Sequence, residues 1–237
     1  MANSYFSFKK FTVHQEKCAM KVTTDACMFG AWCASEIEDE KIAKDNLLDI
    51  GTGTGLLSLM IAQKNKLKID AVEIDNTAAE QAIENISNAS FTNIKVHHSD
   101  IISFQKTGYH YIISNPPFYE DELSSPSPAR SAAHHGTALL WNELFNIISN
   151  KLLPNGKFFL LLPYKRNSTI DTLLQAHDLY LEKRITVGHS SDHPPSRILI
   201  KGSKQKAPLI EEAWQIKDGE GYSKTFISLL KDYYLYL

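Results

Sequence analysis

The feature that most constrains this sequence is a regular alternation of short apolar runs and amphipathic stretches between residues 47 and 162. The apolar runs predict buried strands at residues 47–50, 69–73, 93–97, 109–114 and 157–162, with helices at 56–63, 77–87 and 139–152. Strands that alternate with helices pair in parallel, so the pattern predicts an α/β chain with a doubly wound, mostly parallel sheet and helices on both faces. In such sheets a ligand binds beyond the carboxyl ends of the strands.

The pattern changes after Pro163. Strands are expected at 179–188 and 196–201, and the short gap between them has no room for a helix. We therefore expect an antiparallel pair at the sheet edge, followed by a helix at 223–234. The expected organisation is a single domain over residues 1–237, with an N-terminal extension (1–45), a core (46–163), and edge strands with a C-terminal helix (164–237).

Composition narrows the class of protein. Of the 237 residues, 43% are hydrophobic and 22% are charged, which excludes a disordered or collagen-like chain. The net charge of −2 excludes binding of nucleic acid through overall positive charge. Three cysteines without C-x-x-C spacing predict a reduced, cytoplasmic compartment. No export signal is visible, and the longest apolar run, residues 158–162, is far shorter than the ~20 residues of a membrane span, so no membrane association is expected.

A glycine-rich loop follows the first strand of the core. Residues 49–55 read Asp-Ile-Gly-Thr-Gly-Thr-Gly and lead into the first helix, as in a loop whose backbone closely approaches a ligand. The third glycine is misplaced for the G-x-G-x-x-G pattern of a dinucleotide site, and no P-loop motif is present. The residues expected to bind a cofactor here are Asp49, Gly51, Thr52, Gly53 and Gly55.

Acidic residues also follow the second and third strands. Glu73 is expected to accept hydrogen bonds from both ribose hydroxyls of a bound adenosine, because a carboxylate offers two acceptor oxygens. Asp75 is expected to cap the next helix instead. Asp100, followed by Ile101, is expected at the adenine of the same ligand, although Asp100 alone is equally consistent with a loop or cap residue.

Residues 115–118 read Asn-Pro-Pro-Phe and follow the strand expected at 109–114. Two prolines can simply terminate a strand, but this turn lies at the carboxyl end of a central strand, where catalysis is expected. Together with the glycine loop, the motif resembles that of class I S-adenosylmethionine-dependent methyltransferases that modify amino groups. The resemblance implies a Rossmann-like, seven-stranded sheet, S-adenosyl-L-methionine as cofactor, and Asn115, Pro116, Pro117 and Phe118 as catalytic residues.

The chemistry fits this resemblance. The lone pair of an adenine or amide nitrogen is delocalised, which makes the nitrogen a poor nucleophile unless the protein orients its amino group. The side-chain oxygen of Asn115, which also borders the cofactor, and the carbonyl of Pro116 would accept the two amino hydrogens. Positioning then carries most of the catalysis without a strong general base. Phe118 and Tyr119 would stack on the substrate base.

Two further segments narrow the substrate. Residues 19–25 (Ala-Met-Lys-Val-Thr-Thr-Asp) and 222–235 resemble the tRNA-valine (adenine-N6) methyltransferases, which modify the adenine beside the anticodon, at position 37. This resemblance places Lys21, Thr23 and Asp25 near the cofactor and implies a tRNA substrate. The Asn-Pro-Pro-Phe motif alone leaves open adenine in rRNA or DNA, guanine, and glutamine N5 in protein. A non-catalytic RNA-binding protein and an NAD-dependent dehydrogenase are less favoured.

RNA needs positive charge, and the sequence offers two basic clusters, one before residue 24 and one between residues 165 and 206. Each can equally be an ordinary solvated face. The loop at 120–136 is expected to be mobile, with Arg130 reaching the RNA. No set of histidines completes a metal site, so no metal is expected. The oligomeric state is open, with a monomer favoured.

Overall fold

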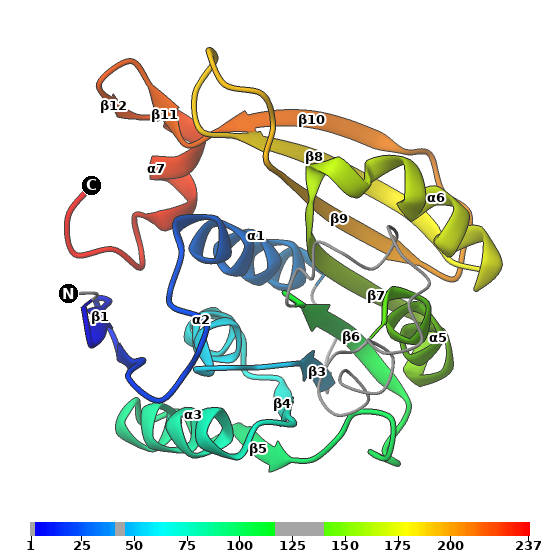
Figure 1. Cartoon of the computed structure of the whole chain (residues 1–237), viewed down its shortest axis with the longest axis horizontal. Helices are drawn as coiled ribbons and strands as arrows, with labels where there is room; N and C mark the ends of the chain where they lie inside the picture. Colours follow the sequence, from blue (N-terminus) through cyan, green and yellow to red (C-terminus); the bar gives the residue numbers. More distant parts are fainter. Residues whose placement is uncertain (1–2, 41–45, 117–139) are drawn as a thin grey trace, which may run out of the picture.

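The computed structural model describes residues 3–40, 46–116 and 140–237. Its main sheet has the strand order β10-β8-β9-β7-β6-β3-β4-β5 (Figure 1). The parallel core consists of β3 (Asn46–Ile50), β4 (Lys68–Glu73), β5 (Ile94–His98), β6 (Tyr109–Ser114) and β7 (Leu152–Pro163). This confirms the α/β, doubly wound and mostly parallel arrangement.

The remaining strands extend the sheet beyond β7. β8 (Tyr180–Gly188) and β9 (Arg197–Ser203) form the expected antiparallel pair, and β9 is also antiparallel to β7. The expected count of seven strands is wrong within the described chain, because β10 (Ile210–Gln215) adds an eighth, parallel to β8. The edge strand is therefore β10 and not the antiparallel pair. Most residues of β10 are exposed or half-buried, which is why no apolar run marks it in the sequence.

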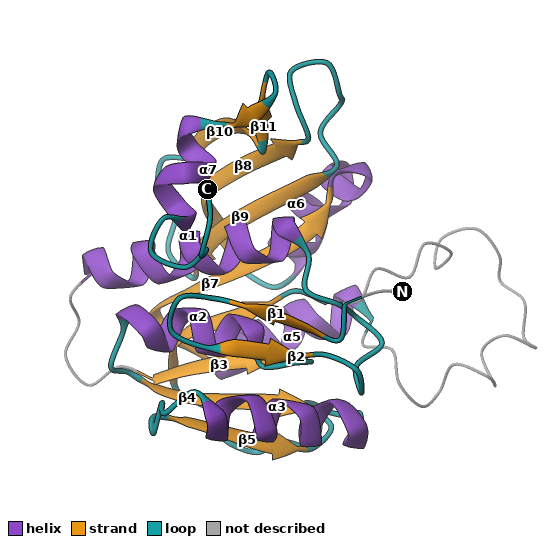
Figure 2. Ribbon diagram, turned by 90° about the vertical axis from the view of Figure 1, so that its left-hand side faces the viewer, coloured by secondary structure: helices purple, strands orange, loops and turns teal. Residues whose placement is uncertain are grey.

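Helices cover both faces of the sheet. One face carries α1 (Thr24–Glu40), α2 (Leu56–Lys64), α3 (Asn76–Asn88) and α7 (Lys224–Leu230), and the other carries α5 (Trp141–Lys151) and α6 (Asn167–Ala176). Figure 2 shows α1, α2 and α3 lying along the sheet. α6, which follows the 3-10 turn η1 (Tyr164–Arg166), was not expected from the sequence.

β7 shows why these strands are continuously apolar. Phe159 and Leu161 pack into the core beneath α1, while Phe158, Leu160 and Leu162 pack into the core beneath α5. Alternate side chains point to opposite faces, so a strand buried on both faces needs apolar residues at every position. Residues 154–156 lie inside β7, where the pairing with β6 shifts register.

Two small hairpins complete the described chain. β1 (Tyr5–Ser7) and β2 (Thr12–His14) form an antiparallel pair in the N-terminal segment, and β2 packs on α3. β11 (Lys217–Asp218) and β12 (Gly221–Tyr222) form the second pair, between β10 and α7. None of the described helices is long and apolar enough to span a membrane.

Candidate functional site

The glycine loop lies between β3 and α2, and its backbone requires glycine. Gly51, Gly53 and Gly55 have φ angles of 70°, 56° and 82°, in the left-handed region that other residues rarely adopt. A Cβ added to Gly51 or Gly53 would meet no atom within 4 Å, so the loop presents bare backbone to open space. The amides of Gly51 and Thr52 donate to the carbonyl of Val72 in β4, at 2.9 and 3.1 Å, which fixes the loop to the sheet.

Asp49, at the start of this loop, is fully buried. Its Oδ2 accepts hydrogen bonds from the hydroxyls of Thr52 and Ser58, both at 2.7 Å. Its Oδ1 is buried and has no partner among the described residues. Burial raises the pKa of Asp49 from 3.8 to about 6, although the two hydroxyls act in the opposite direction. A carboxylate oxygen in this state is suited to accept a hydrogen bond from a ligand.

Glu73 lies at the end of β4, beside the loop. One of its oxygens accepts from the amide of Gly53 at 2.8 Å, and the other accepts from the amide of Asp75 at 3.0 Å. Each carboxylate oxygen has a second lone pair, so Glu73 braces the loop and can still accept from ribose hydroxyls. Asp75 caps α3 through the amide of Ala78 at 2.8 Å, as expected.

Asp100 follows β5 and also makes a local contact. Its Oδ1 accepts from the amide of Ile102 at 2.9 Å, and the amide of Ser99 donates to the carbonyl of Glu73 at 2.9 Å. Ile101 is buried against the core. The segment therefore lies beside Glu73, while contact of Asp100 and Ile101 with adenine stays a prediction.

Asn115 and Pro116 directly follow β6. Ser114 pairs with Ile50 of β3, and its hydroxyl donates to the carbonyl of Ile50 at 2.8 Å, so the carboxyl ends of β6 and β3 lie side by side. The side-chain oxygen of Asn115 is buried and has no partner among the described residues. Pro117, Phe118, Tyr119 and Arg130 lie outside the described residues.

The N-terminal segment approaches the same edge. The ammonium of Lys21 donates to the carbonyls of Gln15 and Cys18, at 2.5 and 2.9 Å. Burial raises the pKa of the Cys18 thiol to about 11. The charge of Glu73 raises this pKa further and the charge of Lys21 lowers it, so the segment lies near enough to Glu73 for their charges to interact.

Thr23 and Asp25 lie at the start of α1. The hydroxyl of Thr23 accepts from the amide of Ala26 at 3.4 Å. Asp25 accepts from Nε of Arg197 at 2.7 Å, which directs its carboxylate toward the start of β9. A cofactor role for Lys21, Thr23 and Asp25 stays a prediction.

Comparison with known proteins identifies the family. The family model "Methyltransferase small domain" matches residues 33–175. A tRNA1(Val) (adenine(37)-N6)-methyltransferase of Dyadobacter fermentans is 40% identical over 241 aligned positions, which cover 98% of each chain. The chain belongs to this methyltransferase family. The resemblance drawn from the glycine loop and the Asn-Pro-Pro-Phe motif is thereby confirmed.

Solved structures share the fold of this methyltransferase at lower identity. A "predicted O-methyltransferase" of Agrobacterium tumefaciens has a TM-score of 0.64 at 15% identity and covers 87% of this chain and 95% of its own. TYW2 of M. jannaschii, solved in complex with AdoMet, has a TM-score of 0.55 at 10% identity, with 84% and 83% covered.

The site of the methyltransferase fits its cofactor, S-adenosyl-L-methionine. The cofactor carries an ammonium group and ribose hydroxyls, and the site offers the unpartnered oxygen of Asp49 and the free lone pairs of Glu73 as acceptors. The bare glycine backbone leaves space beside them. The described residues contain no group of three histidines, cysteines or acids that could hold a metal ion.

The sequence did not single out Ser58. It is fully buried in the first turn of α2 and, with Thr52, holds Asp49 in place. The available signal was a lone hydroxyl among apolar neighbours, directly after a loop that contains a buried acid.

Proposed function

We propose that this methyltransferase transfers the methyl group of S-adenosyl-L-methionine to N6 of adenine 37 in a valine tRNA. The relatives with this name match the chain almost from end to end, which supports the substrate. The observation that carries the chemistry is that the side-chain oxygen of Asn115, at the end of β6 and beside the glycine loop, is buried and has no partner among the described residues.

The residues of this chain position the amino group. Bound S-adenosyl-L-methionine supplies an electrophilic methyl group on its sulfonium. The Asn115 oxygen accepts one hydrogen of the adenine amino group, and the Pro116 carbonyl accepts the other. These two contacts orient the nitrogen lone pair, which is the main requirement for a reaction that needs no strong base. Phe118 and Tyr119 follow directly in the sequence and would stack on the base.

Asp49 and Glu73 hold the cofactor, with Gly51 and Gly53 allowing its close approach. Lys21, Thr23 and Asp25 are proposed to close the pocket from the N-terminal side, and Asp100 with Ile101 from the adenine side. Arg130 is proposed to contact the tRNA.

One assay tests the substrate. The protein is incubated with methyl-labelled cofactor and either a valine tRNA transcript or the same transcript with guanine at position 37, and the RNA is digested to nucleosides. We expect label in N6-methyladenosine with the first RNA only. Label in protein glutamine, in rRNA or DNA alone, or in no acceptor despite cofactor binding would contradict the proposal and identify the alternative.

The matched variants are Asn115→Ala in the site and Asn150→Ala on the exposed face of α5. We expect Asn115→Ala to abolish transfer while cofactor affinity changes little, because the lost acceptor acts on the substrate. Asn150→Ala should match the wild type. Equal loss of transfer and of cofactor binding in Asn115→Ala would make Asn115 a structural residue.

We further propose that the enzyme is a cytoplasmic, single-domain monomer. Cys18, Cys27 and Cys33 are free thiols in the structure, which is consistent with a reducing compartment. Light scattering coupled to size exclusion should give a mass near 26.7 kDa. A mass twice as large would contradict the monomer.

A further inference from the structure

Five of the twelve cations in the two basic clusters are ion-paired with carboxylates of the described chain. Within the described chain, the cluster members that form ion pairs with carboxylates are Lys17, Lys183, Arg184, Arg197 and Lys201. Lys21 donates to backbone carbonyls. A cation whose charge is already neutralised contributes little to the electrostatic binding of RNA. The paired cations therefore do not locate the RNA surface, which we seek by position relative to Asn115.

The sheet edge that carries Asn115 has two sides. On one side, β3, β4 and β5 end at the glycine loop and the acids of the cofactor site. On the other side, β7, β8 and β10 end and β9 begins, with Arg197 paired to both Pro163 and Val187. Neighbouring strands are about 4.8 Å apart, so the end of β8 lies roughly 14 Å along the edge from the end of β6. Nucleotides beside the target adenine that follow the sheet edge away from the cofactor site reach this second side.

A pocket of about 300 Å³ opens at the end of β8. Val187, Ile216 and the ring of Tyr222 line it, and Thr24, His189, Ser196 and Lys217 add polar groups. The carboxylate of Asp25 also lines the pocket, where it is paired with Arg197. The amide of Lys217 donates to the carbonyl of His189 at 2.8 Å, which ties the hairpin of β11 and β12 to the β8–β9 loop. Figure 1 shows this loop beside the hairpin. An apolar wall with hydroxyl, imidazole and ammonium groups suits a nucleotide, with its base on the wall and its phosphate near the cation.

Lys217 is available for such a phosphate. Its ammonium lies 4.1 Å from the ring centroid of Tyr222, and it has no carboxylate partner among the described residues. The Tyr222 ring also stacks on the ring of Phe226, with centroids 4.4 Å apart, which fixes the aromatic face under the ammonium. A surface cation without a carboxylate can release counterions when it meets RNA.

The turn η1 connects this pocket with the end of β6. Tyr164 directly follows β7 and is 37% exposed, and its amide donates to the carbonyl of Ser196 on the pocket wall at 3.1 Å. Arg166, in the same turn, has no charged partner among the described residues. An exposed aromatic ring and a guanidinium without a carboxylate partner, both on one turn at the sheet edge, can contact an unpaired base and a phosphate.

We propose that the surface formed by Tyr164, Arg166, His189, Ser196 and Lys217 binds the single-stranded nucleotides next to the target adenine, with one nucleotide seated in the pocket. This inference rests on the proposed function for the identity of the RNA. It assigns substrate binding to η1, the β8–β9 loop and the hairpin of β11 and β12. The paired cations of the basic clusters are excluded from this role.

Binding of a fluorescent valine tRNA transcript, measured by anisotropy at several salt concentrations, tests the surface. Lys217→Gln should weaken binding about fivefold and lower the salt slope by about one, because one phosphate contact is lost. Lys68→Gln removes the same charge from the exposed start of β4, at the end of the sheet where the parallel strands begin. This variant should bind like the wild type. Tyr164→Ala should weaken binding about tenfold, while Tyr164→Phe keeps the ring and should restore it. Unchanged melting temperatures show that the variants fold.

The methyl-transfer assay on the same proteins separates this inference from the proposed function. If the wild type methylates adenine 37 but Lys217→Gln and Tyr164→Ala both bind tRNA normally, the surface is wrong and the function stands. If the wild type binds tRNA without methylating it, and the two variants bind more weakly, the surface stands and the function is wrong. A wild type that does not bind tRNA overturns both.

Discussion

At the scale of single residues, Asp49 shows how a buried carboxylate can serve a ligand while it destabilises the free protein. Burial raises the pKa of Asp49 to about 6, and the hydroxyls of Thr52 and Ser58 offset only part of this effect. The folded state therefore binds the proton more tightly than the unfolded state. The stabilising contribution is complete below about pH 4 and is lost as the pH rises through 6.

Asp49→Asn should remove this pH dependence. At pH 7 the variant should be more stable by about 1 kcal/mol, because relief of the buried charge, worth roughly 3 kcal/mol, exceeds the cost of the unpartnered amide group. Cofactor affinity should fall at least about tenfold, because the free acceptor of Asp49 is lost. Denaturant unfolding at pH 5 and pH 8, with and without cofactor, measures both effects. Unchanged cofactor affinity would show that Asp49 does not contact the cofactor.

The positions of several candidate site residues could be predicted from the sequence, but the contacts of their side chains could not. The order of motifs located Asp49, Glu73 and Asn115 at one sheet edge, and helix-capping rules assigned Asp75 correctly. That both oxygens of Glu73 accept backbone amides was not predictable, because it depends on how the glycine loop folds back on β4. The pairing of Asp25 with Arg197 was also not predictable, because 172 positions separate the two residues in the sequence.

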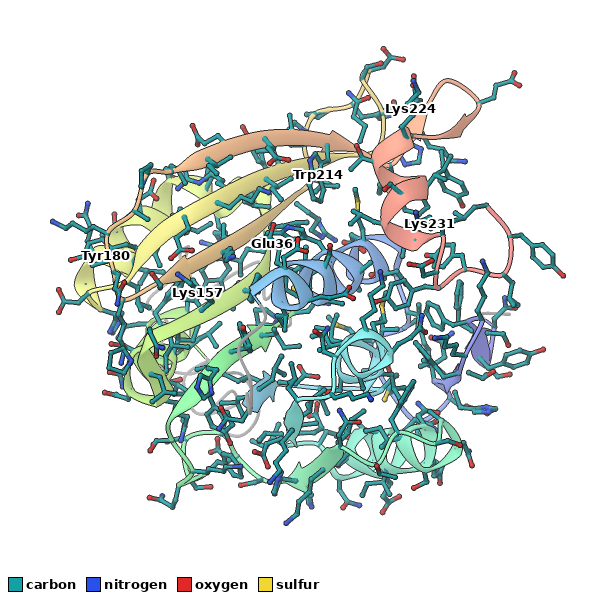
Figure 3. The ribbon with its side chains drawn as sticks, turned by 180° about the vertical axis from the view of Figure 1, so that it is seen from behind. Glu36, Lys157, Tyr180, Trp214, Lys224 and Lys231 are labelled. Carbon is teal, nitrogen blue, oxygen red and sulfur yellow. The ribbon has the colours of Figure 1, made fainter. Side chains whose placement is uncertain are left out.

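At the scale of elements, Glu36 joins α1 to the added strands. It accepts from Trp32 at 3.0 Å on its own helix, from Lys183 of β8 at 3.3 Å and from Lys201 of β9 at 3.0 Å. Figure 3 labels Glu36 between α1 and these strands. Burial alone would raise the pKa of Glu36, but the hydrogen bond and charge of Lys201, with the charge of Lys183, lower it below 4.5. The stability contributed by this carboxylate is therefore present above about pH 4.5 and lost as the pH falls through its lowered pKa.

Glu36→Ala should lower the free energy of unfolding at pH 7 by about 2 kcal/mol, because the partly buried ammonium of Lys201 loses this carboxylate and Lys183 keeps only its ion pair with Glu212. Glu36→Gln should cost less, since the amide oxygen still accepts a hydrogen bond. Both variants should lose less stability than the wild type between pH 7 and pH 4. The same loss in all three proteins would mean that Glu36 does not hold the strands to α1. Denaturant unfolding across this pH range gives the answer.

Gly202 in β9 allows the close packing of the antiparallel strands. A Cβ there would lie 2.4 Å from the ring of Phe158 and 2.5 Å from the carbonyl of Tyr180. Gly202→Ala should therefore destabilise the protein by about 3 kcal/mol through overpacking. Gly221→Ala is the matched control, because its Cβ would meet nothing closer than 4.0 Å and should change stability by less than about 0.5 kcal/mol. Similar melting temperatures for the two variants would contradict this.

The elements that the sequence missed share a physical cause. α6 is ten residues long and carries a single apolar i, i+3, i+4 set, Ile170, Leu173 and Leu174. β10 has no buried residue and is joined to the sheet by backbone pairing with β8. Both elements therefore leave only a weak apolar signal in the sequence.

At the scale of the whole molecule, the two ends of the chain support each other. The amide of Lys9 donates to the carbonyl of Tyr233 at 2.8 Å, and Phe8 pairs with Tyr234, whose ring centroid lies 5.9 Å away. The hydroxyl of Tyr233 donates to the carbonyl of Met60 in α2 at 3.0 Å. Figure 1 shows the two termini near one another, beside α2 and α7. The C-terminal tail thus fixes the segment that leads to Lys21 and Thr23.

This arrangement predicts thermodynamic coupling between Phe8 and Tyr234. We compare the double variant Phe8→Ala/Tyr234→Ala with its two single variants in a double-mutant cycle. The loss of stability in the double variant should be about 1 kcal/mol smaller than the sum of the losses in the single variants. Phe104→Ala provides the control, because Phe104 packs on the opposite face of the sheet and should be additive with Phe8→Ala. Since the N-terminal segment is proposed to close the cofactor pocket, Phe8→Ala should also weaken cofactor binding more than Phe104→Ala does. Additive changes at Phe8 and Tyr234 would mean that the termini lie together without stabilising each other.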